Sequence, residues 1–223
     1  MNLRKVDLVW KPFSSHPTLK TFNIMVHAKN PRKRRERTRE HLTPEEVTKL
    51  LKASKETRHP ERDYCLLLLM VRHGLRASEA CQLKLCDIHL TQKNLYVERQ
   101  NNGISTTHPL FNGEVKTIRD RLAKRARMID GRPDPGTLFI SQRRTPFSRS
   151  MVWHIIKDCA EAAGLAELAV HPHMLRHSTG FDMVNRGMDT RGIQQYLGHA
   201  NIQHTVKYTA LGPNRFANLT WSF

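Results

Sequence analysis

The sequence has few cysteines and no long hydrophobic run. The four cysteines form no CxxC pair and lie in apolar or helical surroundings, which predicts reduced, buried side chains rather than disulfides or zinc ligands; they are Cys65, Cys81, Cys86 and Cys159. The most apolar stretch, YCLLLLMV at 64–71, is far shorter than the roughly 20 residues that span a bilayer. No signal peptide opens the chain. We therefore expect a globular cytoplasmic protein with no membrane partner.

Acidic residues are also scarce. The 223 residues include 20 Asp and Glu against 37 Lys and Arg, a formal charge of +17. Such a surface attracts a polyanion, because neutralised phosphates release their condensed counterions. An acidic membrane is the alternative, but no basic amphipathic helix with an aromatic face stands out. The charge therefore favours nucleic acid as the partner.

Basic side chains are densest just before the predicted globular part. Residues 1–40 lack sustained periodicity and end in KNPRKRRERTRE, with Lys29, Arg32, Lys33, Arg34, Arg35, Arg37 and Arg39 close together. Such a block is either a solvated tail or an arm that becomes ordered on DNA. We favour the arm, and we expect these seven residues to bind DNA.

The globular part is predicted to span 41–223 and to be mainly helical. Its first helix starts at HLTPEEVTKLL, where Thr43 can cap, Pro44 suits the first turn and Glu46 completes a capping box. A buried helix follows and is closed by Gly74, and the next begins near residue 77, so Arg76 lies at a helix junction. Further helices are expected at 112–129, at 148–163 and in three segments after 171. No internal repeat or low-complexity segment is present.

Two strand-like segments interrupt the helices. LYVER at 95–99 and ISTTHPL at 104–110 flank NNG, and Asn102 followed by Gly103 predicts a hairpin turn. The short TLFIS at 137–141 is a candidate for one more strand. The fold class is therefore mainly α with a small antiparallel β-sheet.

Histidines gather around an arginine in HPHMLRHSTGFDMVNRG, residues 171–187. In a helix that begins at Pro172, the side chains of His173, Arg176 and His177 share one face. An arginine between histidines near a helix start suits an anionic oxygen. The alternative is a metal hydrolase that uses His173, His177 and His199, but the chain lacks an HExxH motif. We expect no metal and no cofactor.

Four short motifs occur in a fixed order along the chain. They are Arg76 within GLRASE, HxxR from His173 to Arg176, LGH ending at His199, and Tyr208 nine residues later. The ordered set resembles the tyrosine recombinase (phage integrase) family over nearly all of 41–210. STTHPL, HPHMLRHSTGF and DTRGIQQYLGHANIQHTVKYTA are similar to the small bacterial recombinases that invert fimbrial promoters.

The resemblance implies a metal-independent reaction. Tyr208 would attack a phosphodiester, giving a 3'-phosphotyrosyl link and a free 5'-hydroxyl. Arg76 and Arg176 would bind the nonbridging oxygens, His173 would assist proton transfer from the tyrosine, and His199 would hydrogen-bond the phosphate. Glu79 is expected to orient this site, and His177 is interpreted as a supporting structural residue.

The resemblance also implies the partners. They are double-stranded DNA with inverted repeats, other copies of the chain in a tetramer on synapsed DNA, and accessory DNA-bending proteins; the free protein is expected to be a monomer in the nucleoid-containing cytoplasm. The predicted function is site-specific inversion of a promoter segment, as in fimbrial phase variation. The tail offers anchors that pack either on their own core or on a neighbour, namely Phe216, Leu219, Trp221 and Phe223.

One position departs from the family pattern. A lysine is usual at the hairpin tip, where it protonates the departing 5'-oxygen, but the matching residue here is Asn101, and no lysine occurs between Lys93 and Lys116. Arg99 is a candidate DNA contact and a poor substitute acid, because its pKa is too high. The open alternatives are a compensated recombinase, a slow variant, and a DNA-binding transcriptional regulator of the same fold.

Overall fold

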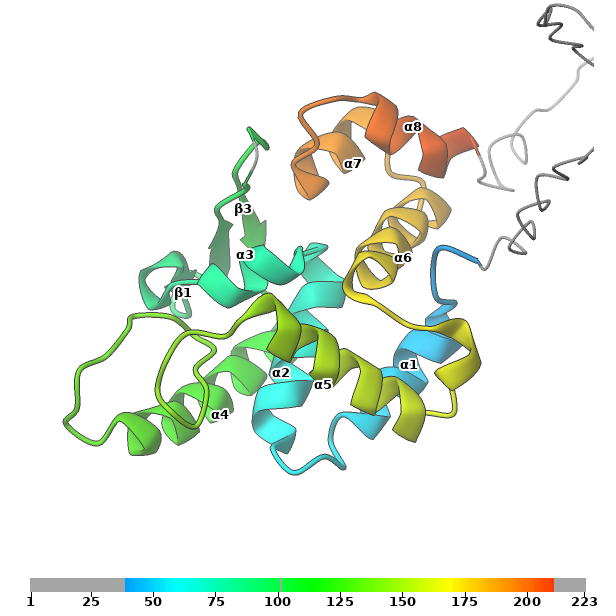
Figure 1. The fold of residues 1–223 in the computed structure, drawn as a ribbon. Coiled ribbons are helices and arrows are strands. Elements are labelled where there is room, and N and C mark those ends of the chain that lie inside the picture. Colours follow the sequence, from blue (N-terminus) through cyan, green and yellow to red (C-terminus); the bar gives the residue numbers. More distant parts are fainter. Residues whose placement is uncertain (1–38, 101, 211–223) are drawn as a thin grey trace, which may run out of the picture. The chain divides into compact units, whose positions relative to one another are not determined.

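The computed structural model describes residues 39–100 and 102–210. Most of the basic segment, Asn101 and the tail residues Phe216, Leu219, Trp221 and Phe223 lie outside the described residues, so the predictions made for them stay predictions. Figure 1 shows the helices packed around α2, with the strands and the helices α7 and α8 on one side.

Helix α1, Pro44–Ala53, begins as the sequence predicts. The Thr43 hydroxyl accepts from the Glu46 amide at 3.3 Å, and the Glu46 carboxylate accepts from the Thr43 amide at 2.8 Å. This capping box satisfies two amides that a helix start leaves without partners. Arg39, expected on DNA, forms an ion pair with Glu46 at the same helix start.

Helix α2, Pro60–His73, is the centre of the hydrophobic core. Its run of leucines is buried on all sides because α1, α4 and α6 pack around it. Gly74 ends the helix in the left-handed conformation, at φ 58°, which an L side chain adopts at a cost. Helix α3, Ala77–Gln82, starts three residues later, so Arg76 lies at the junction as expected.

The predicted antiparallel hairpin is present. Strands β2, Asn94–Val97, and β3, Thr106–Pro109, pair with Leu95 opposite His108, and the short β1, Ile88–His89, adds a third strand after the 3-10 turn η1, Leu85–Asp87. The paired strands are shorter than predicted. After β2, the Arg99 side chain turns into the protein, while its backbone amide donates to the Ser105 hydroxyl at 3.0 Å.

Helices α4, Asn112–Ile129, and α5, Arg149–Ala162, agree with the predicted ranges, and η2, Ala166–Leu168, follows α5. The strand proposed at 137–141 does not form. Thr137 and Ile140 make isolated bridges to Lys84 and Pro146, so this segment lies in the core without a continuous ladder. The prediction that all four cysteines are buried is wrong for Cys86, which is exposed after α3; all four are free thiols.

The C-terminal helices are α6, Pro172–Asn185, α7, Thr190–Leu197, and α8, Gln203–Ala210. They share a small apolar cluster, separate from the main core, that contains Met183, Ile193, Leu197 and Tyr208. In this way α8 is held against α6 and α7, and α6 against α2. No helix in the described ranges is long and apolar enough to cross a membrane.

The buried leucines of α2 predict a large stability effect. Leu69 is fully buried, so Leu69→Ala should lower the free energy of unfolding by about 2–5 kcal/mol, through lost burial and the cavity left behind. The exposed Met188 is the control, and Met188→Ala should change it by less than about 0.5 kcal/mol. Urea unfolding followed by circular dichroism measures both, and equal effects would contradict the assigned core.

Candidate active site

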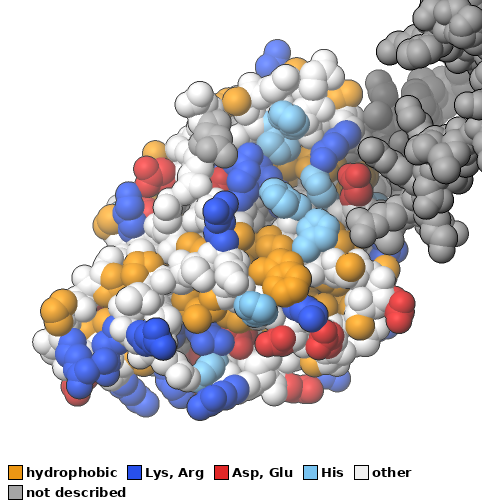
Figure 2. All heavy atoms as spheres, viewed as in Figure 1, with side chains coloured by type: hydrophobic (Ala, Val, Ile, Leu, Met, Phe, Trp, Pro, Cys, Tyr) orange, Lys and Arg blue, Asp and Glu red, His pale blue; other side chains and the backbone are white. Residues whose placement is uncertain are grey.

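An open pocket of about 320 Å³ lies between α3, the hairpin tip and the three C-terminal helices. Its lining includes the five residues expected to be catalytic, which are Arg76, His173, Arg176, His199 and Tyr208. Figure 2 shows histidine side chains beside lysine and arginine on this side of the molecule. Residues 132 positions apart in sequence therefore meet at one concave, basic surface.

A buried carboxylate, Glu79, holds this surface together. Its oxygens accept from the Arg76 guanidinium at 2.6 Å and from the Arg76 backbone amide at 2.9 Å. The Arg176 guanidinium lies 3.9 Å from the same carboxylate. Burial opposes the charge of Glu79, but Arg99, the Arg76 amide and Arg176 outweigh it and lower the Glu79 pKa. Glu79 therefore lies ionised between Arg76 and Arg176, and its orienting role stays a prediction.

Arg99 has a different position from the one expected. Its side chain is fully buried, with the guanidinium donating to Glu79 at 2.7 Å and to the carbonyls of Tyr196 at 2.6 Å and His73 at 3.1 Å. The assignment of Arg99 as a DNA contact is therefore wrong for this structure. Its role is internal, because it joins the hairpin to α2, α3 and α7.

Arg176 reaches the pocket through the protein interior. Its guanidinium donates to the Gly74 carbonyl at 2.5 Å and to the carbonyl of Leu197. Burial, together with the charges of Arg76 and Arg99, lowers its pKa to about 9. An anion in the pocket would relieve this repulsion, since two adjacent guanidinium groups bind phosphate oxygens well.

His199 and His173 present neutral imidazoles to the pocket. The His199 Nδ1 is hydrogen-bonded to the Thr205 hydroxyl at 2.8 Å, which leaves Nε2 for a ligand. Burial, then Arg176 and Arg76, lowers the His199 pKa to about 3. The pKa of His173, an exposed residue, is also lowered by partial burial and the same arginines. Both rings are therefore uncharged near neutral pH.

Tyr208 is almost fully buried against α6. A Cβ atom added at Gly180 would lie 2.8 Å from the tyrosine ring, so the glycine allows α8 to approach this closely. The hydroxyl lies 2.8 Å from Nδ1 of His177. Burial raises the Tyr208 pKa to about 12. His177, rather than His173, is thus the imidazole that contacts the tyrosine oxygen.

The three histidines of the metal alternative do not converge. His177 faces Tyr208 and Lys207, while His199 faces Thr205. Within 39–100 and 102–210, no three His, Cys, Asp or Glu side chains are placed to hold a metal ion. The geometry therefore offers no support for the metal hydrolase.

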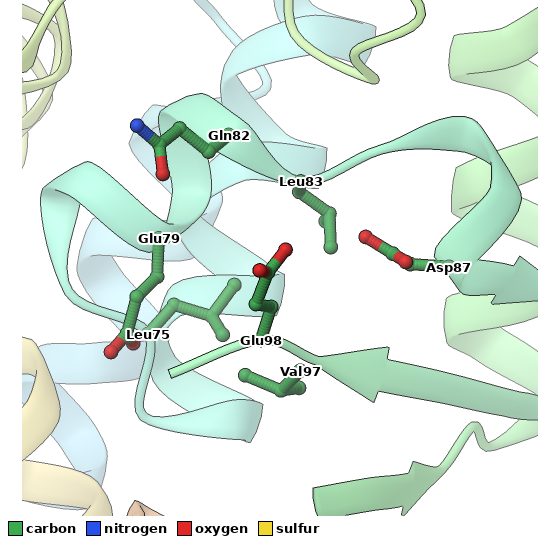
Figure 3. A pocket seen from close by; sticks show the side chains of 7 residues that line it. All are labelled: Leu75, Glu79, Gln82, Leu83, Asp87, Val97 and Glu98. Carbon is green, nitrogen blue, oxygen red and sulfur yellow. The ribbon is translucent and has the colours of Figure 1, made fainter. Parts of the chain in front are cut away.

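A second pocket, lined by Glu79 among others, lies between α3, η1 and the end of β2 (Figure 3). Its free volume of about 10 Å³ has room for a single water molecule. The acidic side chains of Asp87 and Glu98 border it. It is too small for an organic ligand and too acidic for a phosphate, so we assign it no ligand.

Two residues near the site were missed by the sequence reasoning. Thr205 fixes the His199 ring, and Lys207 lines the pocket with Nζ 3.3 Å from Nε2 of His177. Lys207 had a signal, since it directly precedes the expected nucleophile in a helix. Thr205 had none, because a threonine six residues after a histidine has no recognisable pattern.

Comparison with known proteins identifies the class. Residues 40–215 match the model described as the phage integrase family. The chain belongs to this family, and it is a tyrosine recombinase, an enzyme that cleaves and rejoins DNA.

Among the relatives, it is 47% identical to the type 1 fimbriae regulatory protein FimB of Escherichia coli K12, over 80% of this chain and 88% of that protein. It is 42% identical to FimE of the same strain, over 81% of this chain and 90% of that protein.

Solved structures agree with the fold. The crystal structure of the XerA recombinase gives a TM-score of 0.68 at 28% identity, over 79% of this chain and 62% of that one. The XerH recombinase bound to its difH substrate, a pre-cleavage complex, gives a TM-score of 0.67 at 22% identity, over 83% of this chain and 53% of that one. The chain thus spans between half and two thirds of these recombinases.

The charge of Glu79 predicts a pH-dependent stability effect. Glu79→Gln removes the anion among three arginines and should lower the free energy of unfolding by about 3–5 kcal/mol near neutral pH. Because the folded pKa of Glu79 is below its usual 4.5, the stabilisation is complete above that value and is lost as the pH falls through the folded pKa. Urea unfolding between about pH 3 and 8 measures the difference. A difference independent of pH would contradict the charge explanation.

The close approach of Gly180 and Tyr208 predicts that a glycine-to-alanine substitution, which usually stabilises a helix, destabilises this one. Alanine in a helix is normally about 1 kcal/mol better than glycine, yet Gly180→Ala should destabilise the protein by about 1–3 kcal/mol, because the methyl group collides with the ring. In a Tyr208→Ala background the same change should be neutral or stabilising. Urea unfolding of the parent protein, the two single variants and the double variant gives the coupling free energy between the two positions. Additive effects would argue against the observed packing.

Proposed function

We propose that this recombinase inverts a promoter-bearing DNA segment between inverted repeats, in the manner of fimbrial phase variation. One observation carries the chemical part of the proposal: two arginines, two neutral histidines and a tyrosine line a single pocket. The similarity to FimB and FimE, whose names describe regulators of type 1 fimbriae, supports the biological part.

In the proposed cleavage step the Tyr208 oxygen attacks the scissile phosphorus. The bond from phosphorus to the 5'-oxygen breaks, the DNA 3'-phosphate becomes linked to the tyrosine, and the departing 5'-oxygen takes up a proton. A 5'-hydroxyl from another strand then reverses the step. No bond energy is lost to hydrolysis, so rejoining needs no external energy source.

The arginines bind the charge that develops on the nonbridging oxygens. Arg76 and Arg176 are held before DNA arrives, Arg76 by Glu79 and Arg176 by backbone carbonyls. Donors fixed in this way need no reorganisation when the transition state forms. In the tautomer whose Nδ1 accepts from the Thr205 hydroxyl, His199 would donate to the phosphate through Nε2. His173 lines the same pocket.

The source of the proton for the 5'-oxygen is the open step. Asn101 occupies the position where the family pattern has lysine, and an amide does not donate a proton near neutral pH. Loss of a general acid typically lowers a rate by about 10²- to 10⁴-fold. We therefore propose slow cleavage; a chain that binds DNA without cleaving it is the alternative outcome.

Assembly and location belong to the same proposal. We infer that the protein is a monomer in free solution and forms a tetramer on two synapsed sites. We also infer that accessory DNA-bending proteins assist it and that it is located in the cytoplasm, associated with the nucleoid. The domain division into a basic arm at 1–40 and a catalytic domain at 41–223 is also proposed. The arm's arginines and lysines would add salt-dependent phosphate contacts.

The covalent intermediate is the direct test. A nicked duplex built from the inverted repeats beside the gene should give a denaturant-resistant protein–DNA adduct on a gel. Tyr208→Phe should give none, since it lacks the nucleophilic oxygen, and Arg176→Ala should slow formation by about 10²- to 10³-fold. Asn101→Lys should accelerate it, because the substituted ammonium can act as an acid.

Binding of the same duplex, followed by mobility shift, controls for folding and affinity. Tyr208→Phe should bind as the parent protein does. If only Asn101→Lys gives adduct while the parent protein binds the DNA, the regulator becomes the better conclusion. If Tyr208→Phe still gives adduct, the assignment of the nucleophile is wrong.

A further inference from the structure

We propose that His177 and Lys207 form a proton relay that takes the hydroxyl proton of Tyr208, with Lys207 as the final acceptor. The inference rests on the proposed cleavage reaction and deepens it, because it assigns the activation of the nucleophile. His177 touches the reacting oxygen and is therefore proposed as a catalytic residue. Lys207 acts through His177 and is a positioning residue with a protonation role.

The relay is continuous in the structure. The Tyr208 hydroxyl oxygen lies 2.8 Å from Nδ1 of His177, and Nε2 of the same ring lies 3.3 Å from Nζ of Lys207. The histidine comes from α6, while both other residues come from α8. All three line the same pocket. Both nitrogens of one imidazole are thus engaged by groups that can exchange protons.

The arrangement allows two hydrogen-bond patterns that depend on the protonation of Lys207. When Lys207 is an ammonium it donates to Nε2, and the proton on Nδ1 is donated to the tyrosine oxygen. When Lys207 is a neutral amine it accepts from Nε2, and the tyrosine hydroxyl donates to Nδ1. Only the second pattern points the hydroxyl proton along the relay.

The chemical step conserves every proton. The Tyr208 O–H bond breaks as Nδ1 gains a proton, and Nε2 releases its proton as Nζ gains one. The products are a phenolate, a neutral imidazole and a lysine ammonium. The phenolate then attacks the phosphorus. No imidazolium forms at either end of the step.

The absence of an imidazolium product distinguishes the relay from a mechanism in which His177 alone is the base. Burial, followed by the charges of Lys207 and His173, lowers the His177 pKa to about 4, while burial raises the Tyr208 pKa to about 12. A transfer that ended on His177 would be strongly uphill. A transfer that ends on Lys207 is less so, because an amine is a much stronger base than this imidazole.

The surroundings of Lys207 favour its neutral form in part. Partial burial and Arg176 lower its pKa, and Glu40 opposes them. The charged or titratable groups that face the relay from neighbouring elements are Glu40, Arg76, His171, His173, Arg176 and His199. The neutral fraction of Lys207 therefore increases with pH, and it becomes appreciable at a lower pH than for an ordinary lysine because the pKa is lowered.

The first experiment needs no DNA and follows the His177 tautomer. The full-length protein, labelled with ¹⁵N in its histidine rings, is titrated from about pH 6 to 11, and the His177 signals are assigned by their loss in His177→Ala. The relay predicts that the proton moves from Nδ1 to Nε2 as Lys207 loses its charge, and that Lys207→Met abolishes the change. An unchanged tautomer across the titration, or the same change in Lys207→Met, would overturn the relay whatever the protein does to DNA.

The second experiment measures adduct formation under single-turnover conditions with saturating nicked duplex. The rate should increase with pH through the Lys207 pKa. His177→Ala should lower it by about 10²-fold or more. Lys207→Arg should lower it roughly tenfold or more at about pH 9 and flatten the profile, because arginine stays charged. His154→Ala and Lys157→Arg, exposed on α5, are the matched controls and should leave rate and profile unchanged.

Lys207→Arg separates the relay from an electrostatic role. If arginine retains both the rate and the pH dependence, Lys207 contributes only charge, and the relay is wrong.

A substrate with sulfur in place of the bridging 5'-oxygen separates nucleophile activation from leaving-group protonation. A thiolate departs without a proton, so a variant that lacks the general acid is rescued, whereas one that lacks nucleophile activation is not. The relay predicts that His177→Ala and Lys207→Arg remain slow on the sulfur substrate. Rescue would show that these residues protonate the departing oxygen and would overturn the relay. If no protein gives adduct but the tautomer change is present, the proposed cleavage is wrong. The coupling between the His177 tautomer and the charge of Lys207 would still hold.

Discussion

The buried carboxylate of Glu79 is the interaction on which the rest of the site depends. It pairs with Arg76 at a helix junction and with Arg99 at the hairpin, and it lies near Arg176 of α6. These three arginines come from a helix junction, the hairpin and α6, which are separate in sequence. A single anion therefore holds the guanidinium groups of Arg76 and Arg99 and offsets the nearby charge of Arg176, and loss of one partner would leave uncompensated buried charge.

The same group of cations sets the protonation of the pocket. Arg76 and Arg176 help to keep His173 and His199 neutral, so these rings can accept or donate a hydrogen bond without carrying charge. Positive charge is concentrated on the guanidinium groups, which suit phosphate oxygens. The neutral rings are left for hydrogen bonding and proton transfer. Charge and proton chemistry are thus divided among different residue types within one pocket.

Local patterns accounted for most of the fold. The capping box at Thr43 and Glu46, the glycine that ends α2 and the hairpin around Asn102 are all short-range signals. The sequence could not place Arg99, because burial of an arginine depends on a carboxylate twenty residues away. The missing strand at 137–141 and the exposure of Cys86 likewise depend on tertiary packing. The ordered motifs identified the family and the pocket residues, but the contact between His177 and Lys207 requires α8 to pack on α6.

The central claim is that Tyr208 forms the covalent bond to DNA, and peptide mass spectrometry tests it most directly. Adduct from the nicked duplex is digested with a protease and a nuclease, and the peptide that carries the residual nucleotide is fragmented to locate the modified side chain. The account predicts a phosphotyrosyl linkage at Tyr208. A nucleotide on any other side chain would contradict it.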